Sequence, residues 1–217
     1  MREPFADRNA AGDALGARVA QLALRRPLVL GLPRGGVVVA ARIAERLGAP
    51  LDVVIVRKIG CPGHRELAMG ALAVWGPHSA VVRNEHVIAT AGVSEAKFER
   101  AREREAVEAQ RRVAEWGQPV PDVSDTDVVL VDDGLATGAT MHAALEVAGR
   151  AGAKRLICAV PVGAPVELSE LADQVDELVY LDAPHQFHAV GLHYRDFREV
   201  DDATVAEALA AARARVG

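Results

Sequence analysis

The sequence contains few cysteines, few aromatic residues and no long apolar run. Its two cysteines, Cys61 and Cys158, stand far apart among 217 residues, which excludes a disulfide framework and a cysteine-based metal site. Gly, Pro or charged residues interrupt every apolar run well before the ~18 residues that a membrane span requires. The charged residues between Met1 and Arg8 leave no room for the apolar segment of a secretory signal. We therefore expect a cytoplasmic protein with no membrane partner.

The composition suits a single domain with a sizeable core. Hydrophobic residues make up 50% of the chain and charged residues 25%, so the chain can fill an interior and still have a polar surface. We expect one domain over residues 1–217, with its core at about 9–180. The formal net charge of −5 argues against a nucleic-acid partner. Residues 25–65, in contrast, contain eight Arg or Lys against two acids, which indicates an anion-binding segment.

Short runs of Val, Leu and Ile alternate with longer Ala-rich amphipathic segments. This order is typical of parallel strands that are buried on both faces and connected by helices. We therefore expect an α/β fold with an open, mostly parallel, twisted sheet flanked by helices. The expected strands are Leu28 to Leu32, Asp52 to Val56, Val128 to Val131, Arg155 to Val160 and Leu178 to Leu181. The expected helices are Ala10 to Arg25, Gly36 to Leu47, Ser94 to Trp116, Thr140 to Gly149, Pro165 to Asp173 and Asp202 to Arg215.

Two segments interrupt the alternation. Residues 61–127 form a long insertion, which we expect to be a mobile loop that contains an antiparallel pair, Ala71 to Trp75 with Ser79 to Val82. The charged helix in this insertion is most simply a solvated face. The second segment, at about 181–200, is rich in aromatic residues and histidines, and we expect it to form a small hood. A C-terminal helix at about 202–215 follows it.

The stretch from Val128 to Thr140 contains the most informative motif. Four apolar residues precede Asp132 and Asp133, and a loop of small residues then leads into a helix. At the carboxyl end of a parallel strand, two carboxylates can accept hydrogen bonds from vicinal hydroxyls. The unpaired N–H groups at the start of the helix favour a phosphate. The alternative is that one acid and one threonine only cap an ordinary helix.

These thirteen residues resemble the motif with which type I phosphoribosyltransferases bind 5-phosphoribosyl 1-pyrophosphate (PRPP). The resemblance implies that Asp132 and Asp133 hold the ribose hydroxyls. It also implies that the 5-phosphate lies on Ala136, Thr137, Gly138, Ala139 and Thr140. Upstream, Arg34, Gly35 and Gly36 resemble the pyrophosphate loop of the family, although alone they would fit an ordinary turn. Arg57 and Lys58 resemble the basic end of the next strand, although they would also fit any charged strand end.

The resemblance implies a PRPP-dependent pentosyltransferase that acts on a nucleobase or related nitrogen nucleophile and releases pyrophosphate. Arg34, Lys58, Asp132 and Asp133 are then the catalytic residues. Mg²⁺ is implied as a cofactor that PRPP itself holds, with water linking it to an acid and no dedicated protein ligand. A homodimer is implied as well. Two alternatives stay open: a regulator that senses PRPP without catalysis, and an enzyme that acts on another phosphorylated sugar.

The resemblance places the acceptor under the hood. Phe187 and Tyr194 are candidates to stack on a planar base, although packing of the hood onto the sheet is the favoured alternative. Ala136 stands where 6-oxopurine enzymes carry an acid, which disfavours hypoxanthine and guanine as acceptors. Arg65 is a candidate from the mobile loop. The three hood histidines, His185, His188 and His193, lack the spacing and the cysteines of a zinc site.

Overall fold

The core of the molecule is a five-stranded parallel sheet. The computed structural model describes residues 3–216, except for the side chains of residues 65, 66 and 216. The strand order is β2 (Leu51–Val53), β1 (Leu28–Gly31), β6 (Asp127–Val131), β7 (Arg155–Val162) and β8 (Glu177–Asp182). All residues of β1 and β6 are buried, which is the reason why these strands read as continuous apolar runs. The predicted parallel sheet is confirmed.

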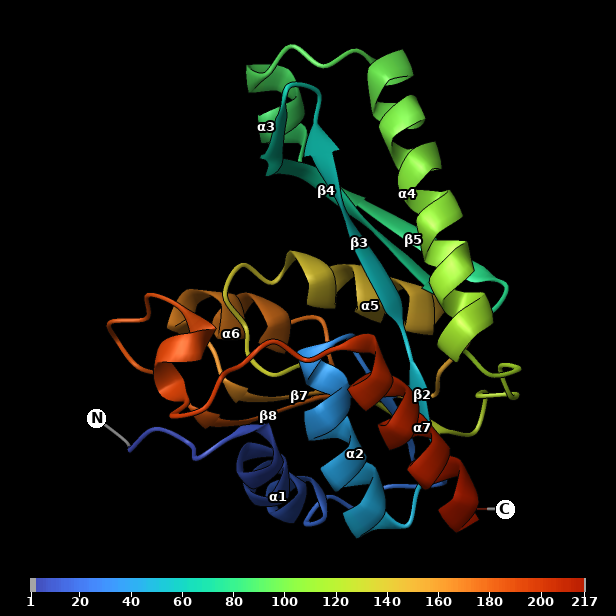
Figure 1. Cartoon of the computed structure of the whole chain (residues 1–217), viewed down its shortest axis with the longest axis vertical. Helices are drawn as coiled ribbons and strands as arrows, with labels where there is room; N and C mark the ends of the chain where they lie inside the picture. The colour runs from blue at the N-terminus through green and yellow to red at the C-terminus, as the bar shows by residue number, and fades with distance from the viewer. Residues whose placement is uncertain (1–2, 217) are drawn as a thin grey trace.

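Helices cover both faces of this sheet (Figure 1). One face is packed by α1 (Arg8–Val19), α2 (Gly35–Leu47) and α7 (Asp202–Val216). The other face is packed by α5 (Ala139–Arg150) and α6 (Pro165–Ala172). Within the described residues, no helix is both long enough and apolar enough to span a bilayer.

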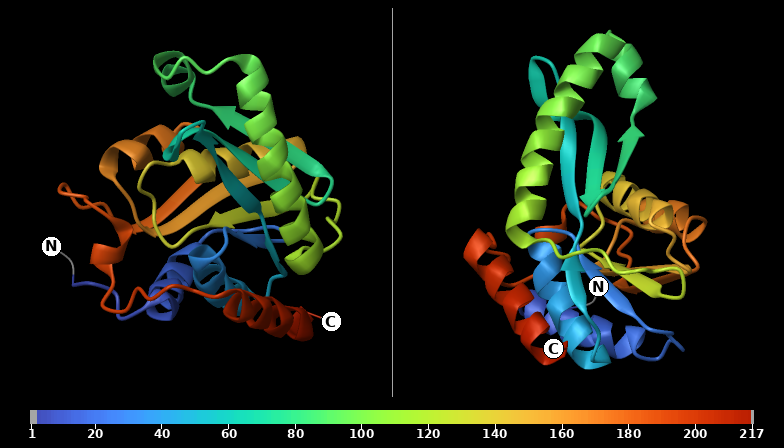
Figure 2. Two further views of the ribbon diagram at one scale, coloured as in Figure 1. Left: turned by 45° about the horizontal axis from the view of Figure 1, so that its top comes forward. Right: turned by 90° about the vertical axis from the view of Figure 1, so that its right-hand side faces the viewer.

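A second sheet forms an arm above the core, clearest in the right-hand view of Figure 2. It is antiparallel, with the order β3 (Ile55–Cys61), β4 (His64–Trp75) and β5 (His78–Arg83). The arm also contains α3 (Glu85–Thr90), which the sequence reading missed, and the long α4 (Glu95–Trp116). The three strands pack against α4 and α5. The predicted antiparallel pair is therefore confirmed and is longer than expected.

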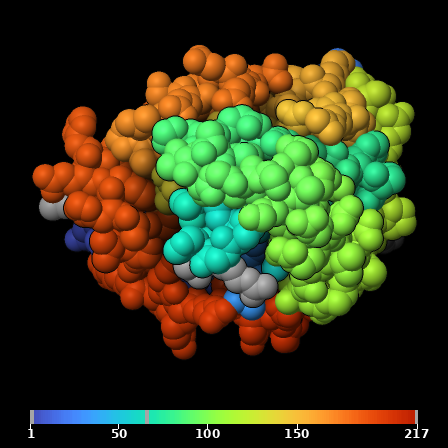
Figure 3. All heavy atoms as spheres, turned by 90° about the horizontal axis from the view of Figure 1, so that it is seen from above, coloured from blue at the N-terminus to red at the C-terminus, as the bar shows by residue number. Residues whose placement is uncertain are grey.

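The arm corrects two expectations about residues 52–127. The strand predicted from Asp52 to Val56 is divided at Val54, where the chain leaves the parallel sheet as β2 and enters the arm as β3. The mobile-loop insertion predicted at residues 61–127 holds more regular structure than the expected antiparallel pair and charged helix, because it also contains α3 and a longer β4, whose Leu72 and Trp75 are buried. Seen from above, the arm covers much of the core and the hood lies to one side (Figure 3).

The hood is short and is joined to the start of the chain. After β8, the chain contains one turn of 3-10 helix, Val190–His193, before it reaches α7. The N-terminal segment lies beside the hood, because Phe5 and Tyr194 form a parallel β-bridge. The Phe5 nitrogen donates to the carbonyl of His193, and the Arg195 nitrogen donates to the carbonyl of Phe5, at 2.9 and 2.8 Å. The first residues of the chain therefore help to build the hood.

Candidate functional site

Two loops meet at the carboxyl ends of β1 and β6. The strands are neighbours in register, with Gly31 opposite Val131, and the Leu32 nitrogen donates to the Val131 carbonyl at 2.9 Å. We call Arg34–Gly36, the turn after β1, the Arg-Gly-Gly turn, and Asp132 and Asp133, which follow β6, the acid pair. Ligands of open α/β sheets bind at this edge.

Glycine is required where the Arg-Gly-Gly turn approaches the acid pair. A Cβ atom on Gly35 would lie 1.9 Å from Oδ2 of Asp133, and one on Gly36 would lie 2.8 Å from Cα of Asp132. Both distances are too short for any larger residue unless the turn or, at Gly35, the Asp133 carboxylate moves. The structure thus brings together the two motifs that the sequence analysis assigned to one ligand, although they are about a hundred residues apart in the chain.

The acid pair places two carboxyl groups side by side, and hydrogen bonds from neighbouring groups offset only part of their charge. Oδ1 of Asp132 accepts from the backbone N–H of Asp133 at 2.8 Å, and Oδ2 of Asp133 accepts from Nε of Arg8 at 2.8 Å. Burial, and then the charge of Asp133, raises the pKa of Asp132 well above its ordinary value. Burial also raises the pKa of Asp133, against the hydrogen bond from Arg8. Such a pair suits a ligand that brings hydroxyl donors or a cation.

The acid pair does not cap the following helix. Helix α5 begins at Ala139, and its N-cap is Gly138, with φ 66° and no side-chain cap. The capping alternative raised for the acids is therefore wrong. We call residues Ala136–Thr140 the Thr-Gly loop. The helix that starts there leaves N–H groups without intrahelical partners beside the exposed Thr137, which is a suitable arrangement for a phosphate.

Arg57 and Lys58 point toward different parts of this region. Arg57 lines a cavity of about 410 Å³ together with Arg34, whereas Lys58 lines one of about 660 Å³ together with Thr137 and Ala139. Successive side chains of a strand point to opposite faces, which accounts for the division. Both residues also line a third cavity, of about 650 Å³, between the β3–β4 hairpin and α4.

Of the three basic residues predicted to bind pyrophosphate, Arg34 and Arg57 already form ion pairs with acidic side chains. The guanidinium of Arg34 is paired with Glu199 and, at 3.5 Å, with Asp202. The Nε atom of Arg57 donates to Glu105 of α4 at 3.0 Å. Among the described side chains, Lys58 has no ion pair within 4.0 Å. The candidate Arg65 lies outside the side chains that the structure describes.

The hood aromatics are engaged in packing. Tyr194 is buried, its ring contacts Phe5 and Phe197, and its hydroxyl donates to the Asp133 carbonyl at 2.6 Å. For Tyr194, these contacts agree with the alternative that the hood aromatics pack the hood onto the sheet. The half-buried Phe187 stacks on His193 with ring centroids 5.4 Å apart. The three hood histidines do not join any potential metal-binding group found among the described residues.

Gly134, which directly follows the acid pair, lies against the hood. A Cβ atom at this position would lie 2.4 Å from Cγ1 of Val190, in the hood turn. A branched side chain here would therefore push the hood away from the acid pair. The glycine allows the hood to pack closely over the loop that follows β6.

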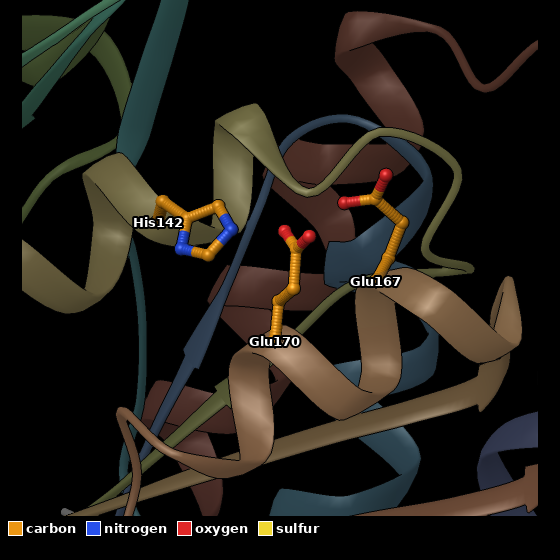
Figure 4. Close-up of side chains that lie close together, drawn as sticks. All are labelled: His142, Glu167 and Glu170. Carbon is orange, nitrogen blue, oxygen red and sulfur yellow. The ribbon is translucent and has the colours of Figure 1, made fainter.

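A cluster beside the Thr-Gly loop was missed by the sequence analysis. His142 of α5 and Glu167 and Glu170 of α6 point toward one another (Figure 4), and their ligand atoms lie within 4.8 Å of one another. Nδ1 of His142 lies 2.9 Å from Oε1 of Gln174. Burial, and then the charge of Glu170, raises the pKa of Glu167. All three residues are at least partly open to solvent, where such groups are common without an ion. Glu167 and Glu170 therefore place two acidic side chains beside the Thr-Gly loop.

The sequence analysis also missed Arg8 as a residue of this site. It begins α1, its side chain is only 11% exposed, and it makes the one ion pair to the acid pair among the described side chains. In the sequence, Arg8 is one member of a charged N-terminal run, and 125 positions separate it from Asp133. No local spacing could have connected the two residues.

Comparisons with known proteins agree with this geometry. Residues 8–195 match the family model described as the phosphoribosyl transferase domain. A Mycobacterium tuberculosis protein provisionally named a phosphoribosyl transferase is 41% identical over 200 residues, which are 91% of this chain and 44% of that protein. The chain therefore spans less than half the length of this relative. The crystal structure of TT1426 from Thermus thermophilus matches with a TM-score of 0.75 and 44% identity, over 96% of this chain and 98% of that chain.

Proposed function

Because the chain belongs to the phosphoribosyl transferase family, we propose that it transfers the 5-phosphoribosyl group of PRPP to a nucleobase or a related nitrogen nucleophile and releases pyrophosphate. One observation carries the proposal: the acid pair and the Thr-Gly loop follow β6, and the Arg-Gly-Gly turn follows the neighbouring β1 in register. This arrangement supports a pentose that carries one phosphate and one pyrophosphate group.

Each loop has a distinct role in the proposal. Asp132 and Asp133 accept hydrogen bonds from the ribose hydroxyls, and Ala136–Thr140 hold the 5-phosphate on their N–H groups. The Arg-Gly-Gly turn, with Arg57 and Lys58, neutralises the pyrophosphate. Lys58 is the basic residue with the least competition for this role, since Arg34 and Arg57 have to share their charge with the acids that already pair with them.

The reaction requires orientation and charge neutralisation more than covalent chemistry by the protein. The bond from C1 of the ribose to the pyrophosphate oxygen breaks, and a bond from C1 to the acceptor nitrogen forms, while the proton of the acceptor nitrogen passes to the departing pyrophosphate. Positive charge develops on the sugar in the transition state, so fixed carboxylates below the ring and excluded water both favour it. Pyrophosphate leaves more readily when basic groups offset its charge.

The acid pair fits a Mg²⁺ ion that is bound together with PRPP. Two adjacent, half-buried carboxyl groups face a single cationic side chain among those that the structure describes, Arg8, so the pair favours a further cation. Asp132 and Asp133 would hold the ion through water, and PRPP would supply most of the ligands. When bound, Mg²⁺ supplies charge neutralisation for the pyrophosphate.

The acceptor site and the assembly belong to the proposal as well. We retain Phe187 as the candidate that stacks on the acceptor base. We assign Tyr194 to packing, because its ring and hydroxyl are already engaged. The family resemblance further implies a homodimer, which sedimentation of the purified chain would test. A cytoplasmic location is proposed from the composition of the chain.

The test is pyrophosphate release in the presence of PRPP, Mg²⁺ and a panel of nucleobases that includes purines and pyrimidines. We expect release from PRPP with at least one base, and none from PRPP when the base is omitted. If the protein binds PRPP but releases pyrophosphate with no base, the catalytic proposal is wrong and a PRPP-sensing role is favoured. Turnover of another phosphorylated sugar, with none of PRPP, would also contradict the proposal.

A further inference from the structure

Arg8 occupies an unusual position for a residue so close to the start of the chain. Its Nε donates to Oδ2 of Asp133 at 2.8 Å, and the two side chains are 11% and 16% exposed. In every other ion pair of the described side chains, at least one partner is more than 20% exposed. An ion pair shielded in this way interacts more strongly than a surface pair and is costly to leave half-formed.

The guanidinium of Arg8 is held from two further directions. Nη1 donates to the backbone carbonyl of Arg198 at 2.9 Å, and Cζ lies 3.9 Å from the centroid of the Phe197 ring. Both contacts come from the segment between the hood and α7. The fork of Arg8 therefore has a fixed orientation before it meets Asp133, which a flexible surface arginine lacks.

Arg8 also lies against the Arg-Gly-Gly turn. A Cβ atom on Gly35 would lie 2.7 Å from Nε of Arg8, as well as 1.9 Å from Oδ2 of Asp133. The arginine thus sits at the junction of the two loops. The backbone of Asp133 is held at the same time, since Tyr194 donates to its carbonyl at 2.6 Å. The N-terminal segment and the hood consequently fix both the carboxylate and the main chain of one acid.

We propose that Arg8 is a positioning residue for PRPP, which holds the Asp133 carboxylate in one orientation so that it can accept a ribose hydroxyl. This inference rests on the proposed function and adds a residue from outside the recognised motifs. Without Arg8, Asp133 would have Asp132 as its charged neighbour and the neutral Tyr194 beside it; Asp196 faces Arg8 from the hood. Burial beside Asp132 would then favour the protonated form of Asp133, which is a poorer acceptor.

The first experiment measures PRPP binding by calorimetry with Mg²⁺ between pH 6 and 9, for the wild type, Arg8→Ala and Arg8→Lys. We expect Arg8→Ala to weaken binding about 10-fold or more at pH 7, because a desolvated charge partner is lost. The deficit should shrink as the pH rises and Asp133 ionises. Arg8→Lys should recover part of the affinity, since it restores the charge without the fork. Arg18→Ala, at the other end of α1, is the matched control and should bind like the wild type.

The second experiment needs no ligand and uses the ionisation of Asp133 itself. The side-chain carboxyl carbon of Asp133, followed by NMR, should titrate at a higher pH in Arg8→Ala than in the wild type, and Arg8→Lys should lie between them. An unchanged titration would overturn the inference. So would tighter PRPP binding by Arg8→Ala, which would make Arg8 a plug, or a loss that is the same at every pH and in both variants. Failure of the wild type to bind PRPP, in contrast, would overturn the proposed function.

Discussion

The edge of the parallel sheet and the long helix of the arm both contain pairs of arginine and acid, but the pairs differ in burial. Arg8 and Asp133 at the sheet edge are 11% and 16% exposed, whereas Arg111 and Glu108 on α4 are 55% and 35% exposed. On α4, the pairs follow from i,i+3 and i,i+4 spacing along one helix. At the sheet edge, the partners come from segments 125 positions apart. Pairs of arginine and acid therefore link neighbouring turns of one helix on α4, and distant segments of the chain at the sheet edge.

The difference separates charges that water screens from charges that the fold holds partly out of water. Exposed pairs contribute about 0–1 kcal/mol each, because water screens them and holding long side chains costs entropy. The acid pair is the opposite case, since burial raises the pKa of both carboxyls and opposes their ionisation. Carboxyl groups with pKa values perturbed in this way are typical of functional sites. Four variants would test this distinction.

The largest effect is expected when the acid pair is neutralised. Asp132→Asn together with Asp133→Asn should weaken PRPP binding by about 100-fold or more, because two charge-assisted hydrogen bonds to the ribose are lost. Circular dichroism should show the wild-type fold, since both residues follow the last buried residue of β6. Asp173→Asn, at the exposed end of α6, is the control and should bind like the wild type. Unchanged affinity in the double variant would show that the ribose assignment is wrong.

The next largest effect is expected from crowding the same edge without changing a charge. Gly35→Ala places a methyl group 1.9 Å from Oδ2 of Asp133, so the turn or the carboxylate has to move. We expect the free energy of unfolding to fall by about 1–3 kcal/mol, as overpacking usually causes, and PRPP binding to weaken. Urea unfolding and calorimetry measure the two effects. Gly149→Ala is the control, because its new methyl would meet nothing closer than 3.8 Å; equal behaviour of the two variants would contradict the close approach.

A smaller and more selective effect is expected at Arg34. Its guanidinium is partly exposed and already paired with Glu199 and Asp202. In exposure it therefore resembles the arginines of α4, but it lies at the edge of the parallel sheet. Arg34→Ala should weaken pyrophosphate binding about 10-fold and ribose 5-phosphate binding less than about 2-fold, since a single charged contact is removed. Competition of each ligand against PRPP measures both. Equal losses for the two ligands would contradict the assignment of the turn to pyrophosphate.

The smallest effect is expected on the arm helix. Arg111→Ala removes the pairs with Glu108 and Glu115, all three of which are open to solvent. The free energy of unfolding should change by less than about 0.5 kcal/mol, and PRPP affinity should not change. Chemical denaturation at low and at high salt measures this. A loss of PRPP affinity would remove the distinction between the two regions, because it would give the charges of α4 a role in binding.

The sequence predicted the parts of the fold that depend on neighbouring residues. The run from Val128 to Thr140 encodes a strand, an acid pair and a helix start within a few positions, and its structure matches the parallel sheet that was expected. The helix from Gly36 to Leu47 was predicted within one residue, since Gly48 ends it in a left-handed conformation. Local patterns of this kind need no knowledge of the rest of the chain.

The features that were missed depend on contacts between distant segments. Arg8 is important because α1 packs where it can reach Asp133, and nothing in its own neighbourhood in the chain indicates that. The division of the second strand at Val54 depends on where the arm lies, because Val54 itself is apolar and buried like its neighbours. The His142 cluster likewise requires α5 and α6 to lie side by side. Such pairings follow from tertiary packing, which a single sequence does not display.

The division at Val54 ties two basic residues to the sheet by a short length of chain. The Val54 nitrogen donates to the Gly31 carbonyl at 3.2 Å, next to the start of the loop that leads to Arg34. Arg57 lies three residues further on, about 10 Å along an extended strand. The hydrogen bond at Val54 therefore fixes the start of β3, and with it Arg57 and Lys58, beside the end of β1.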